Sequence, residues 1–266
     1  MPLFSIVTIN YNNINGFIRT KTCLEVQICQ NFEWIIVDGG SSDGFLELNL
    51  SSTTMNHILI SQKDNGIYDA MNKGIKLASG EFVLFLNSGD LLYDCYTLKK
   101  IEDYLNKSIK SPDIIFGSSL YKLKNGYSLI RKTYLLEEYL WHGLPANQQS
   151  TYYHKRLFTN QNYDLKYEIC GDYFILSSLH SKSYLDCIYF SQSLSIFEAN
   201  GKSFGFKKKL FLEPYQIQKK ILKTSFLKRI LSLLKRFYST SIIIIVSSEF
   251  FKIMYVRLKA WKLIIC

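Results

Sequence analysis

Four short polar residues, Asn87-Ser88-Gly89-Asp90, directly follow the apolar stretch Glu81–Leu86. Such a stretch is typical of a buried β-strand, so the run places a carboxylate where a strand ends. Open α/β sheets bind their ligands at the carboxyl ends of their strands. A carboxylate there suits a hard divalent cation that carries a phosphate. The same four residues are also an ordinary turn sequence, and only the neighbouring segments can decide between the two interpretations.

Two earlier strand-like stretches also end in polar residues. Thr8, Asn10 and Tyr11 stand at the end of the first, and Asp38 immediately follows the second. A carboxylate at that edge can accept a hydrogen bond from a base imide or from a ribose hydroxyl. The glycines after Asp38 would let a ligand approach the backbone closely. The alternative is that Asp38 and Ser41 only cap the next helix.

Strands and helices alternate over the first 120 residues, which predicts an α/β fold with a mostly parallel central sheet and helices on both faces. The clearest helix is Ile67–Ala78, whose apolar residues recur at helical spacing on one face. The strands are expected at Leu3–Ile9, Glu33–Val37, His57–Ser61, Glu81–Leu86 and Asp113–Gly117, and the other helices near Asn13–Cys29, Gly44–Leu50 and Tyr96–Lys107.

Strands and helices can also be predicted for the later part of the chain. Asn125-Gly126 is a strong turn signal and predicts a hairpin over Leu120–Arg131. We expect the compact domain to end near Lys202. The remaining elements are expected as a helix at Gly171–Ser181, strands at Tyr184–Tyr189 and Leu194–Glu198, and Lys-rich helical segments over Leu210–Phe237.

The chain has 266 residues and a net charge of +10, but this charge is concentrated at the C-terminal end. Residues 206–266 hold 14 Lys and Arg against Glu213 and Glu249. The remainder is close to neutral, which argues against nucleic-acid binding by the body.

The unbroken apolar run of this basic tail, Ile242–Val246, is far shorter than the roughly 20 residues of a membrane span. Basic residues interleaved with large apolar ones, up to the stretch Phe250–Ile265, predict instead a basic amphipathic helical tail on an anionic membrane surface. The alternative is a helical hairpin packed on the body or on a partner.

The six cysteines are scattered with no C-x-x-C spacing, which favours reduced thiols over a zinc site. Met1 leads directly into a strand-like stretch, and we expect no secretory signal peptide. Both observations predict a cytoplasmic protein.

Five segments in order are similar to the nucleotide-sugar half of family 2 glycosyltransferases. The chain resembles most the bacterial enzymes of surface-polysaccharide assembly, such as the colanic-acid type, strongly from Leu3 to about Asp94 and more loosely over Leu144–Ser178. This resemblance implies a GT-A fold at 1–202, with a nucleotide-sugar half at 1–94 and an acceptor half at 95–202, followed by the tail 203–266. The segments are Phe4–Asn12, Trp34–Gly44, Asp64–Gly74, Ala78–Glu81 and Phe85–Asp90.

The resemblance also implies a site for a nucleotide-diphosphate sugar donor. It places Asp38 against the base and Asn87–Asp90 where the family has its metal-binding D-x-D motif, so that Asp90 is the one carboxylate left for Mg²⁺ or Mn²⁺. We expect weaker metal affinity than in a site with two aspartates. The further donor-site residues are Thr8, Asn10, Tyr11, Asp64, Asp69, Asn72, Lys73, Asn87 and Ser88.

On the acceptor side, Cys170-Gly171-Asp172-Tyr173 resembles the acidic motif that the family has ahead of a helix. The resemblance makes Asp172 the general base that deprotonates the acceptor hydroxyl. The alternative is that Asp172 is the N-cap of that helix. The loop Leu144–Ser150 also resembles the family, and it places Gln149 near the donor sugar or the acceptor.

Three functions compete for this sequence. A dinucleotide-dependent oxidoreductase is disfavoured because no G-x-G-x-x-G follows the first strand. The prediction is an inverting, metal-assisted hexosyltransferase that acts on a lipid-linked saccharide at the inner face of the plasma membrane. A weak or inactive scaffold of a membrane polysaccharide-synthesis complex remains the alternative, because the motif lacks acidic residues at Asn87 and Gly89.

Overall fold

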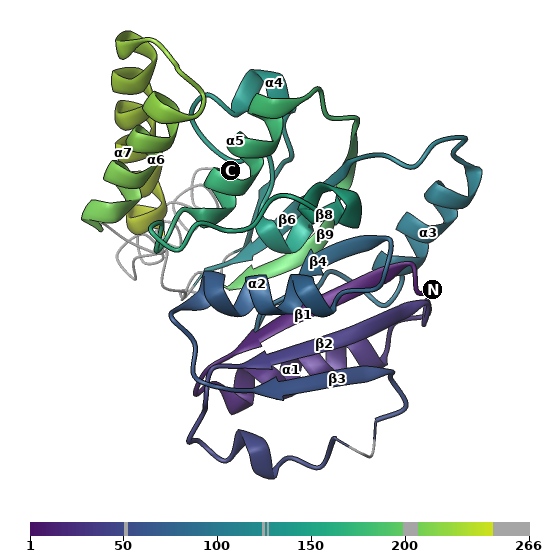
Figure 1. Cartoon of the computed structure of the whole chain (residues 1–266). Helices are drawn as coiled ribbons and strands as arrows, with labels where there is room; N and C mark the ends of the chain where they lie inside the picture. The colour runs from purple at the N-terminus through teal and green to yellow at the C-terminus, as the bar shows by residue number, and fades with distance from the viewer. Residues whose placement is uncertain (51–52, 124–125, 127, 199–206, 247–266) are drawn as a thin grey trace, which may run out of the picture.

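The structure is a computed structural model that describes residues 1–50, 53–123, 126, 128–198 and 207–246. Strands and helices alternate through the first half, as predicted, and helices close the chain (Figure 1). The elements are β1 (Phe4–Asn10), α1 (Ile14–Glu25), β2 (Phe32–Asp38), η1 (Phe45–Glu47), β3 (His57–Ser61), α2 (Ile67–Leu77), β4 (Phe82–Phe85), β5 (Leu91–Leu92), α3 (Thr97–Lys107), β6 (Ile114–Lys122), β7 (Ser128–Arg131), α4 (Leu136–Tyr139), η3 (Gln148–Ser150), β8 (Thr151–His154), η4 (Lys155–Phe158), α5 (Gly171–Lys182), β9 (Cys187–Glu198), α6 (Lys208–Lys220) and α7 (Phe226–Val246).

The described strands form one sheet in the order β3-β2-β1-β4-β8-β6-β9-β5, with β7 paired to β6. The strands β3, β2, β1 and β4 are parallel, as the alternating pattern predicted. The strand β8 then runs antiparallel to both β4 and β6. The sheet is therefore parallel in the first half and mixed in the second, where β6 and β9 are parallel again.

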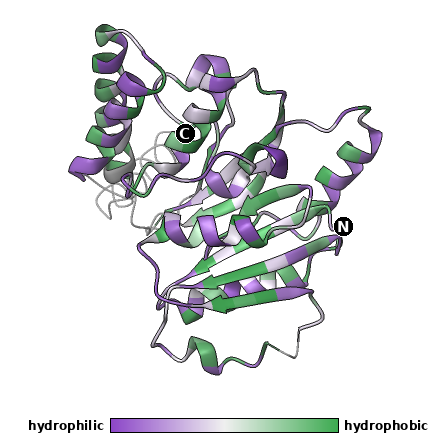
Figure 2. Cartoon of the chain, viewed as in Figure 1, coloured by the Kyte–Doolittle hydropathy of each residue, from purple (hydrophilic) through white to green (hydrophobic). Residues whose placement is uncertain are grey.

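Alternating residues of the strands pack into two apolar cores, one on each face of the sheet. On β1, Phe4 and Ile6 pack with α1 and α3, whereas Val7 and Ile9 pack with α2 and α5. The central strands are accordingly coloured mostly hydrophobic in Figure 2. Burial of both faces explains why these strands read as near-continuous apolar runs.

The predicted face of the helix at Ile67 is the buried one. A Cβ atom at Gly74 would lie 2.3 Å from Cγ1 of Val7, so this position has no space for a side chain. The glycine lets α2 lie directly on β1.

Two element predictions were wrong in detail. In place of the helix expected at 44–50, a 3₁₀ turn forms at Phe45–Glu47, and Phe45 is buried there against the Phe17 ring of α1. The two strands expected at 184–198 are one strand, β9, whose pairing with β6 shifts register at Ser118. A bulge of this kind keeps a strand continuous through a polar interruption.

The hairpin predicted around Asn125-Gly126 is confirmed by the antiparallel pairing of β6 with β7. Residue 125 itself lies outside the described residues. The predicted domain end near Lys202 and the amphipathic stretch Phe250–Ile265 also lie outside them.

The first two helices after residue 206 pack against the body. Figure 1 shows α6 and α7 side by side, with α6 next to α5. Ile217 of α6 is fully buried and joins the apolar core that contains α2 and α5. Among the described helices, none has both the length and the apolar character that a membrane crossing requires.

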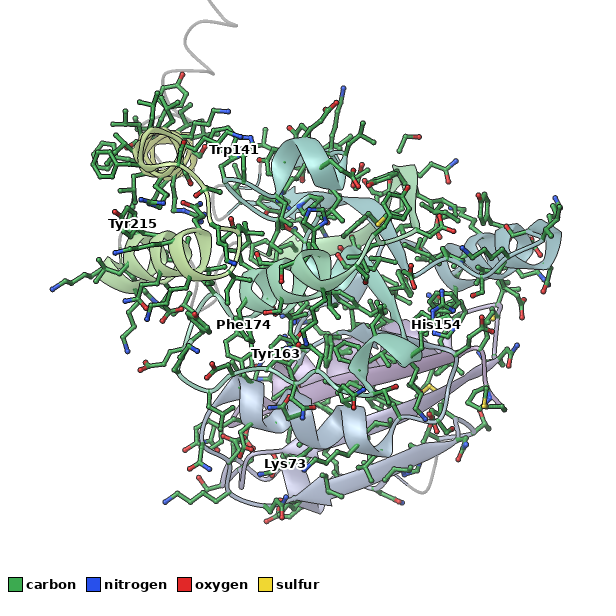
Figure 3. All side chains as sticks on the ribbon, turned by 45° about the horizontal axis from the view of Figure 1, so that its top comes forward. Lys73, Trp141, His154, Tyr163, Phe174 and Tyr215 are labelled. Atoms are coloured by element: carbon green, nitrogen blue, oxygen red, sulfur yellow. The ribbon has the colours of Figure 1, made fainter. Side chains whose placement is uncertain are left out.

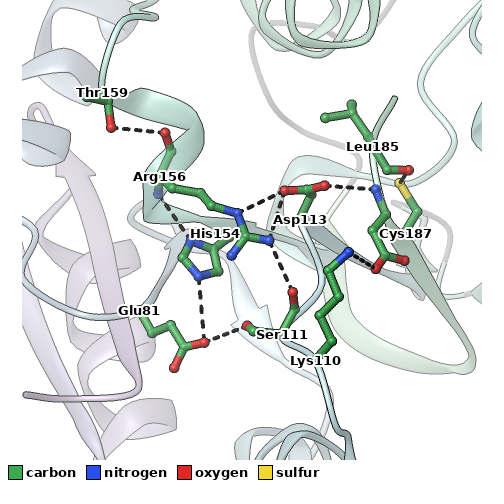
Figure 4. Close-up of polar contacts among 10 residues, drawn as sticks. Glu81, Lys110, Ser111, Asp113, His154, Arg156, Thr159, Leu185 and Cys187 are labelled. Carbon is green, nitrogen blue, oxygen red and sulfur yellow. Dashed lines mark hydrogen bonds and ion pairs between the residues drawn. The ribbon is translucent and has the colours of Figure 1, made fainter. Parts of the chain in front are cut away.

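A polar cluster joins the two halves of the sheet at the edge where β4 and β6 begin and β8 ends. Arg156 Nη2 lies 2.9 Å from Asp113 Oδ1, and Ser111 Oγ donates to Glu81 Oε1 at 2.5 Å (Figure 4). Asp113 Oδ2 also accepts from the backbone N–H of Asp186 at 2.8 Å. Because this edge is opposite to the one where β1, β2 and β4 end, the cluster holds the halves together without occupying that edge.

Candidate active site

The three polar strand ends meet in one hydrogen-bond network. Asn10 Nδ2 donates to Asp38 Oδ1 at 2.9 Å, and Ser88 Oγ donates to Asn10 Oδ1 at 2.9 Å. The network therefore connects the ends of β2, β1 and β4 in that order, which is the order of these strands in the sheet. The structure therefore confirms that these polar strand ends lie close together.

The Asp38 carboxylate is fully buried and is surrounded by five hydrogen-bond donors. Besides Asn10, it accepts from the backbone N–H groups of Gly40 and Ser41 at 3.1 and 2.9 Å and from the hydroxyls of Ser41 and Ser61 at 2.5 and 2.7 Å. Burial by itself raises the pKa of Asp38, but these hydrogen bonds outweigh it and hold the pKa below its usual value. Asp38 thus organises the loop after β2. Its contact with a donor base stays a prediction.

The other residues predicted near the base differ in exposure. Thr8 is buried, and its hydroxyl accepts from Trp34 Nε1 at 2.8 Å and donates to the Leu86 carbonyl at 2.8 Å. This hydroxyl therefore links three strands inside the sheet. In contrast, Tyr11 is 59% exposed at the rim, where it and Asp64 cover Gly39 so closely that a Cβ there would lie 2.5 Å from Asp64 Oδ2.

Three predicted donor-site residues lie on the polar face of α2. Lys73 Nζ forms an ion pair with Asp69 Oδ2 at 3.2 Å, and Figure 3 shows Lys73 on the α2 side of the molecule. The amide of Asn72 bonds to both backbone groups of Tyr163, at 2.9 and 3.0 Å. Asn72 thus holds the backbone of Tyr163 in place. The roles of all three in donor binding stay predictions.

The run Asn87-Ser88-Gly89-Asp90 is indeed a turn, and α1 fixes its shape. Thr20 Oγ1 donates to the Asp90 carbonyl at 2.9 Å and accepts from the Gly89 N–H at 2.9 Å. Gly89 has φ +101°, which a residue with a side chain adopts only with strain. The glycine at the third position of the motif is therefore required by this turn, and Asp90 is held at a defined place by it.

The residues around Asp90 fit a divalent cation. The Asp90 carboxylate accepts from the Gln149 amide at 3.3 Å and from the Asn87 N–H at 3.2 Å. Next to it, Asn87 Oδ1 is buried and has no hydrogen-bond partner among the described residues. No group of three His, Cys, Asp or Glu side chains gathers within the described chain. Asp90 and Asn87 would therefore hold the ion only together with substrate phosphates and water.

One large cavity, of about 670 Å³, lies between this turn and the acceptor half. It brings together five of the residues predicted from sequence, namely Asn87, Ser88, Asp90, Gln149 and Asp172. The other predicted residues, at the strand ends, in the loop before α2 and on α2, do not line this cavity. A cavity of this size with few convergent polar groups is typical of a ligand site.

Asp172 faces the cavity from the second position of α5, so the helix-capping alternative is wrong. Its Oδ1 accepts from the Gln148 amide, which also donates to the Tyr163 hydroxyl at 3.1 Å. Burial raises the pKa of Asp172 to about 7, the hydrogen bonds with Tyr163 and Gln148 oppose this rise, and the charge of Asp90 adds to it. A carboxylate with a pKa near neutrality is well suited to accept a proton.

Tyr68 of α2 fixes the backbone from which Asp172 projects. Its hydroxyl donates to the Ile169 carbonyl at 2.7 Å, and its ring stacks on Tyr163 with centroids 5.1 Å apart. A Cβ at Gly171 would lie 2.6 Å from the Tyr68 ring, so the glycine of the motif is needed for this contact. The helix that carries three of the predicted donor-site residues thus also positions the backbone before Asp172.

Glu213 of α6 holds the same backbone from the other side. This buried carboxylate accepts from three consecutive backbone N–H groups, those of Glu168 and Ile169 at 3.1 Å and of Cys170 at 2.8 Å. The N-cap position of α5, Cys170, makes no capping bond with its own side chain. A residue from the basic tail therefore supplies the acceptor for the segment before Asp172.

Glu213→Ala is expected to lower the free energy of unfolding by about 2–3 kcal/mol, because three backbone N–H groups lose a charged acceptor in a buried place. Urea unfolding of the full chain measures this. Glu168→Ala is the matched control, since Glu168 also links this segment to α6, through an exposed ion pair with Lys209. This substitution should lower the free energy of unfolding by less than about 1 kcal/mol. Equal effects of the two changes would contradict the role given to Glu213.

Several residues of the cavity and of the surroundings of Asp172 were not predicted from the sequence. Tyr68 and Tyr163 reach Asp172 from distant segments, and no local pattern indicates this. Gln148 had a signal, since it lies in the loop that resembles the family. Basic residues of α7 also line the cavity, although their spacing suits a membrane surface equally well. The cavity residues in question are Tyr68, Arg131, Gln148, Lys235 and Arg236.

Known proteins resemble this chain in sequence and in fold. The profile of the family described as "Glycosyl transferase family 2" matches residues 5–179. A relative from Mycobacterium bovis, the PGL/p-HBAD biosynthesis glycosyltransferase, is 30% identical over 179 residues, which are 65% of this chain and 67% of the relative. An uncharacterized glycosyltransferase of Mycobacterium tuberculosis is 37% identical over 90 residues, or 34% of each chain.

Solved structures with low sequence identity have the same fold. The crystal structure of S. aureus TarS 1-349 in complex with UDP-GlcNAc has a TM-score of 0.69 at 17% identity, over 90% of this chain and 73% of that one. The mannosyltransferase PcManGT from Pyrobaculum calidifontis, in complex with GDP-Man and Mn²⁺, has a TM-score of 0.63 at 13% identity, over 84% and 65%. The predicted α/β fold of GT-A type is thereby confirmed. Because the family profile matches more than half of the chain, including the motif turn and most of α5, the chain belongs to glycosyl transferase family 2.

Proposed function

We propose that this protein transfers a sugar, with inversion, from a nucleoside-diphosphate donor to a hydroxyl of a lipid-linked saccharide in the assembly of a bacterial surface polysaccharide. The observation that carries the proposal is the cavity in which Asp172, with a pKa raised to about 7, lies opposite the Asn87–Asp90 turn. The family membership supports the transfer of a sugar. The solved neighbours that contain UDP-GlcNAc and GDP-Man support a nucleotide-sugar donor.

In the proposed reaction, the acceptor hydroxyl binds in the cavity and donates a hydrogen bond to Asp172. Asp172 takes the proton while the acceptor oxygen attacks the anomeric carbon of the donor sugar. The bond from that carbon to the diphosphate breaks at the opposite side, so the configuration inverts and the nucleoside diphosphate leaves. A bound Mg²⁺ or Mn²⁺, held by Asp90 and Asn87, would supply positive charge for the leaving diphosphate.

The remaining protein groups act by positioning. Gln148 holds the Asp172 carboxylate through a hydrogen bond, and Tyr68 and Glu213 fix its backbone. Gln149, which follows Gln148 on η3, donates to Asp90. Together these contacts hold the Asp172 carboxylate in one orientation at the cavity.

The membrane role is proposed from the outer face of α7. Leu227, Leu231 and Leu234 recur at i, i+4 and i+7 and are between 44% and 67% exposed. Basic residues flank this stripe, a combination that suits the interface of an anionic bilayer. A helix that both lines the cavity and lies on a membrane would bring a lipid-linked acceptor to Asp172, at the inner face of the plasma membrane.

Release of nucleoside diphosphate tests the enzymatic proposal. Purified protein is incubated with a panel of nucleotide-sugars and Mn²⁺, first screened by thermal stabilisation, with and without a lipid-linked acceptor. We expect stabilisation by one donor class and product release that depends on the acceptor. A scaffold, the alternative function, would show neither donor hydrolysis nor transfer.

Metal dependence is a separate prediction. We expect activity to be lost in excess EDTA and restored by Mg²⁺ or Mn²⁺ at about millimolar concentration, because the motif Asn87–Asp90 contains a single carboxylate, Asp90. Asn87→Ala should raise the metal concentration for half-activity about ten-fold, and Asn49→Ala, which lies away from the cavity, is the control. Full activity in excess chelator would remove the metal from the proposal.

Membrane binding is tested on the apolar stripe. Leu227→Gln with Leu234→Gln should reduce flotation with anionic vesicles at least several-fold, since each buried leucine contributes about 2 kcal/mol. The same change at Ile18 and Leu46, which are exposed on the body, is the control. Unchanged flotation of the α7 variant would exclude this helix as the membrane contact.

A further inference from the structure

The α7 side of the cavity carries three positive charges that the proposed reaction does not use. Arg131 comes from β7, and Lys235 and Arg236 come from α7. Within the described residues, no carboxylate forms an ion pair with any of the three. Cations that line a cavity without a protein counter-charge favour an anionic ligand.

Neutral groups hold these cations at one loop. Arg236 Nη2 donates to the His142 carbonyl at 2.8 Å, and Arg131 Nη2 donates to the Leu144 carbonyl at 2.6 Å. Carbonyls two residues apart lie within about 7 Å along the chain, so the two guanidinium groups flank the same short segment. Because backbone carbonyls carry no net charge, they orient both arginines and leave the positive charge uncompensated.

Lys235 completes the cluster from the next position of α7. Its Nζ lies 4.7 Å from the centroid of the Trp141 ring, and Figure 3 shows Trp141 beside α7. Burial and the charges of Lys235 and Arg236 lower the pKa of His142 to about 4. His142 is thus neutral at pH 7. In addition, Arg236 Nε is buried and has no hydrogen-bond partner among the described residues.

We propose that Arg131, Lys235 and Arg236 form a phosphate-binding subsite that holds a phosphate or diphosphate ester of the acceptor while its hydroxyl faces Asp172. Guanidinium and ammonium groups are the side chains that recognise phosphate oxygens. The subsite belongs to the acceptor because its residues come from the acceptor half and α7, whereas the proposed place of the donor diphosphate is the Asn87–Asp90 turn. This inference rests on the proposed function for the identity of the two substrates.

Binding of inorganic pyrophosphate to the full-length protein tests the subsite without requiring turnover. The titration is made by calorimetry at saturating UDP with excess Mg²⁺, so that the donor site is filled. Lys235→Gln with Arg236→Gln should weaken pyrophosphate binding at least ten-fold and leave the UDP affinity within two-fold. Lys220→Gln with Lys228→Gln removes the same charge from exposed positions that do not line the cavity, and it should change neither affinity.

The outcomes separate the sources of the anion. Unchanged pyrophosphate binding, or an equal loss in the control pair, would overturn the subsite. A parallel loss of UDP affinity would assign the cations to the donor diphosphate and overturn the acceptor role. If the double variant unfolds, the exposed Lys235→Glu alone should abolish pyrophosphate binding in a folded protein. Failure of the unchanged protein to bind UDP would instead count against the proposed function.

Discussion

Asp172→Asn is expected to lower the rate constant of sugar transfer by about 10³-fold and to leave the affinity for UDP within two-fold. The amide keeps the size of the side chain and its bond to Gln148, but it cannot accept a proton from the acceptor hydroxyl. General-base catalysis contributes about 10²–10⁴-fold, which sets the expected loss. Steady-state kinetics and calorimetry measure the two quantities. Turnover near the unchanged rate would reassign the base.

The same carboxyl should make the rate depend on pH. With a pKa of about 7, Asp172 is an active base only above that pH. At pH 6 the rate of the unchanged protein should be about one tenth of its plateau above pH 8, since one pH unit below a pKa leaves about a tenth of the group ionised. A rate that is flat between pH 6 and pH 8 would contradict the raised pKa.

Asp172→Asn should also make the protein more stable at pH 8. The folded pKa of about 7 lies above the ordinary value of 3.8, so the folded state binds more protons than the unfolded state between these values. The free energy of unfolding of the unchanged protein therefore falls as pH rises from about 4 to about 7, by about 4 kcal/mol at roughly 1.4 kcal/mol per pKa unit. The Asn variant lacks this loss.

Urea unfolding at pH 5 and pH 8, in the absence of metal and nucleotide, measures the difference. Asp103→Asn, at an exposed position of α3, is the control and should follow the unchanged protein at both pH values. If Asp172→Asn and the unchanged protein show the same pH dependence, the carboxyl is not held in a desolvated place. A variant that gains stability as it loses activity is expected where a charge is buried for function.

Asp38→Ala is expected to lower the free energy of unfolding by about 3–5 kcal/mol. Five donors lose their acceptor, and one of them, the Asn10 amide, is itself buried beside the fully buried carboxylate. Each buried donor left without a partner costs about 1–3 kcal/mol, and relaxation of the loop recovers part of the sum. Urea unfolding at pH 7 gives the change directly.

Asp64→Ala is the control for Asp38→Ala, because Asp64 is partly exposed and accepts from the nearby Gly66 N–H at 2.9 Å. We expect a change below about 1 kcal/mol there. If Asp38→Ala were as stable as Asp64→Ala and only nucleotide binding were lost, Asp38 would be a ligand contact alone. The expected result is a lower free energy of unfolding for Asp38→Ala than for Asp64→Ala, since the Asp38 carboxylate connects β1, β2 and the loop that follows β2.

The sequence alone identified the polar strand ends and the family. Both depend on short segments, because a buried strand followed by Asn, Asp, Ser or Gly is a local pattern and adjacent parallel strands end at one edge. The pattern therefore placed Asn10, Asp38 and Ser88 together, and the structure confirms the contacts between them. It could not show that protein donors saturate Asp38, because one of them, Ser61, comes from a different strand.

Only the tertiary structure decided how the basic tail relates to the site. Helices rich in Lys and Leu have the same amphipathic pattern whether they lie on a bilayer or on a protein, so the sequence left both open. The decisive contacts join Glu213 to Cys170 and Arg236 to His142, across 43 and 94 residues. The raised pKa of Asp172 has the same origin, because desolvation is a property of the residues packed around a group and not of its neighbours along the chain.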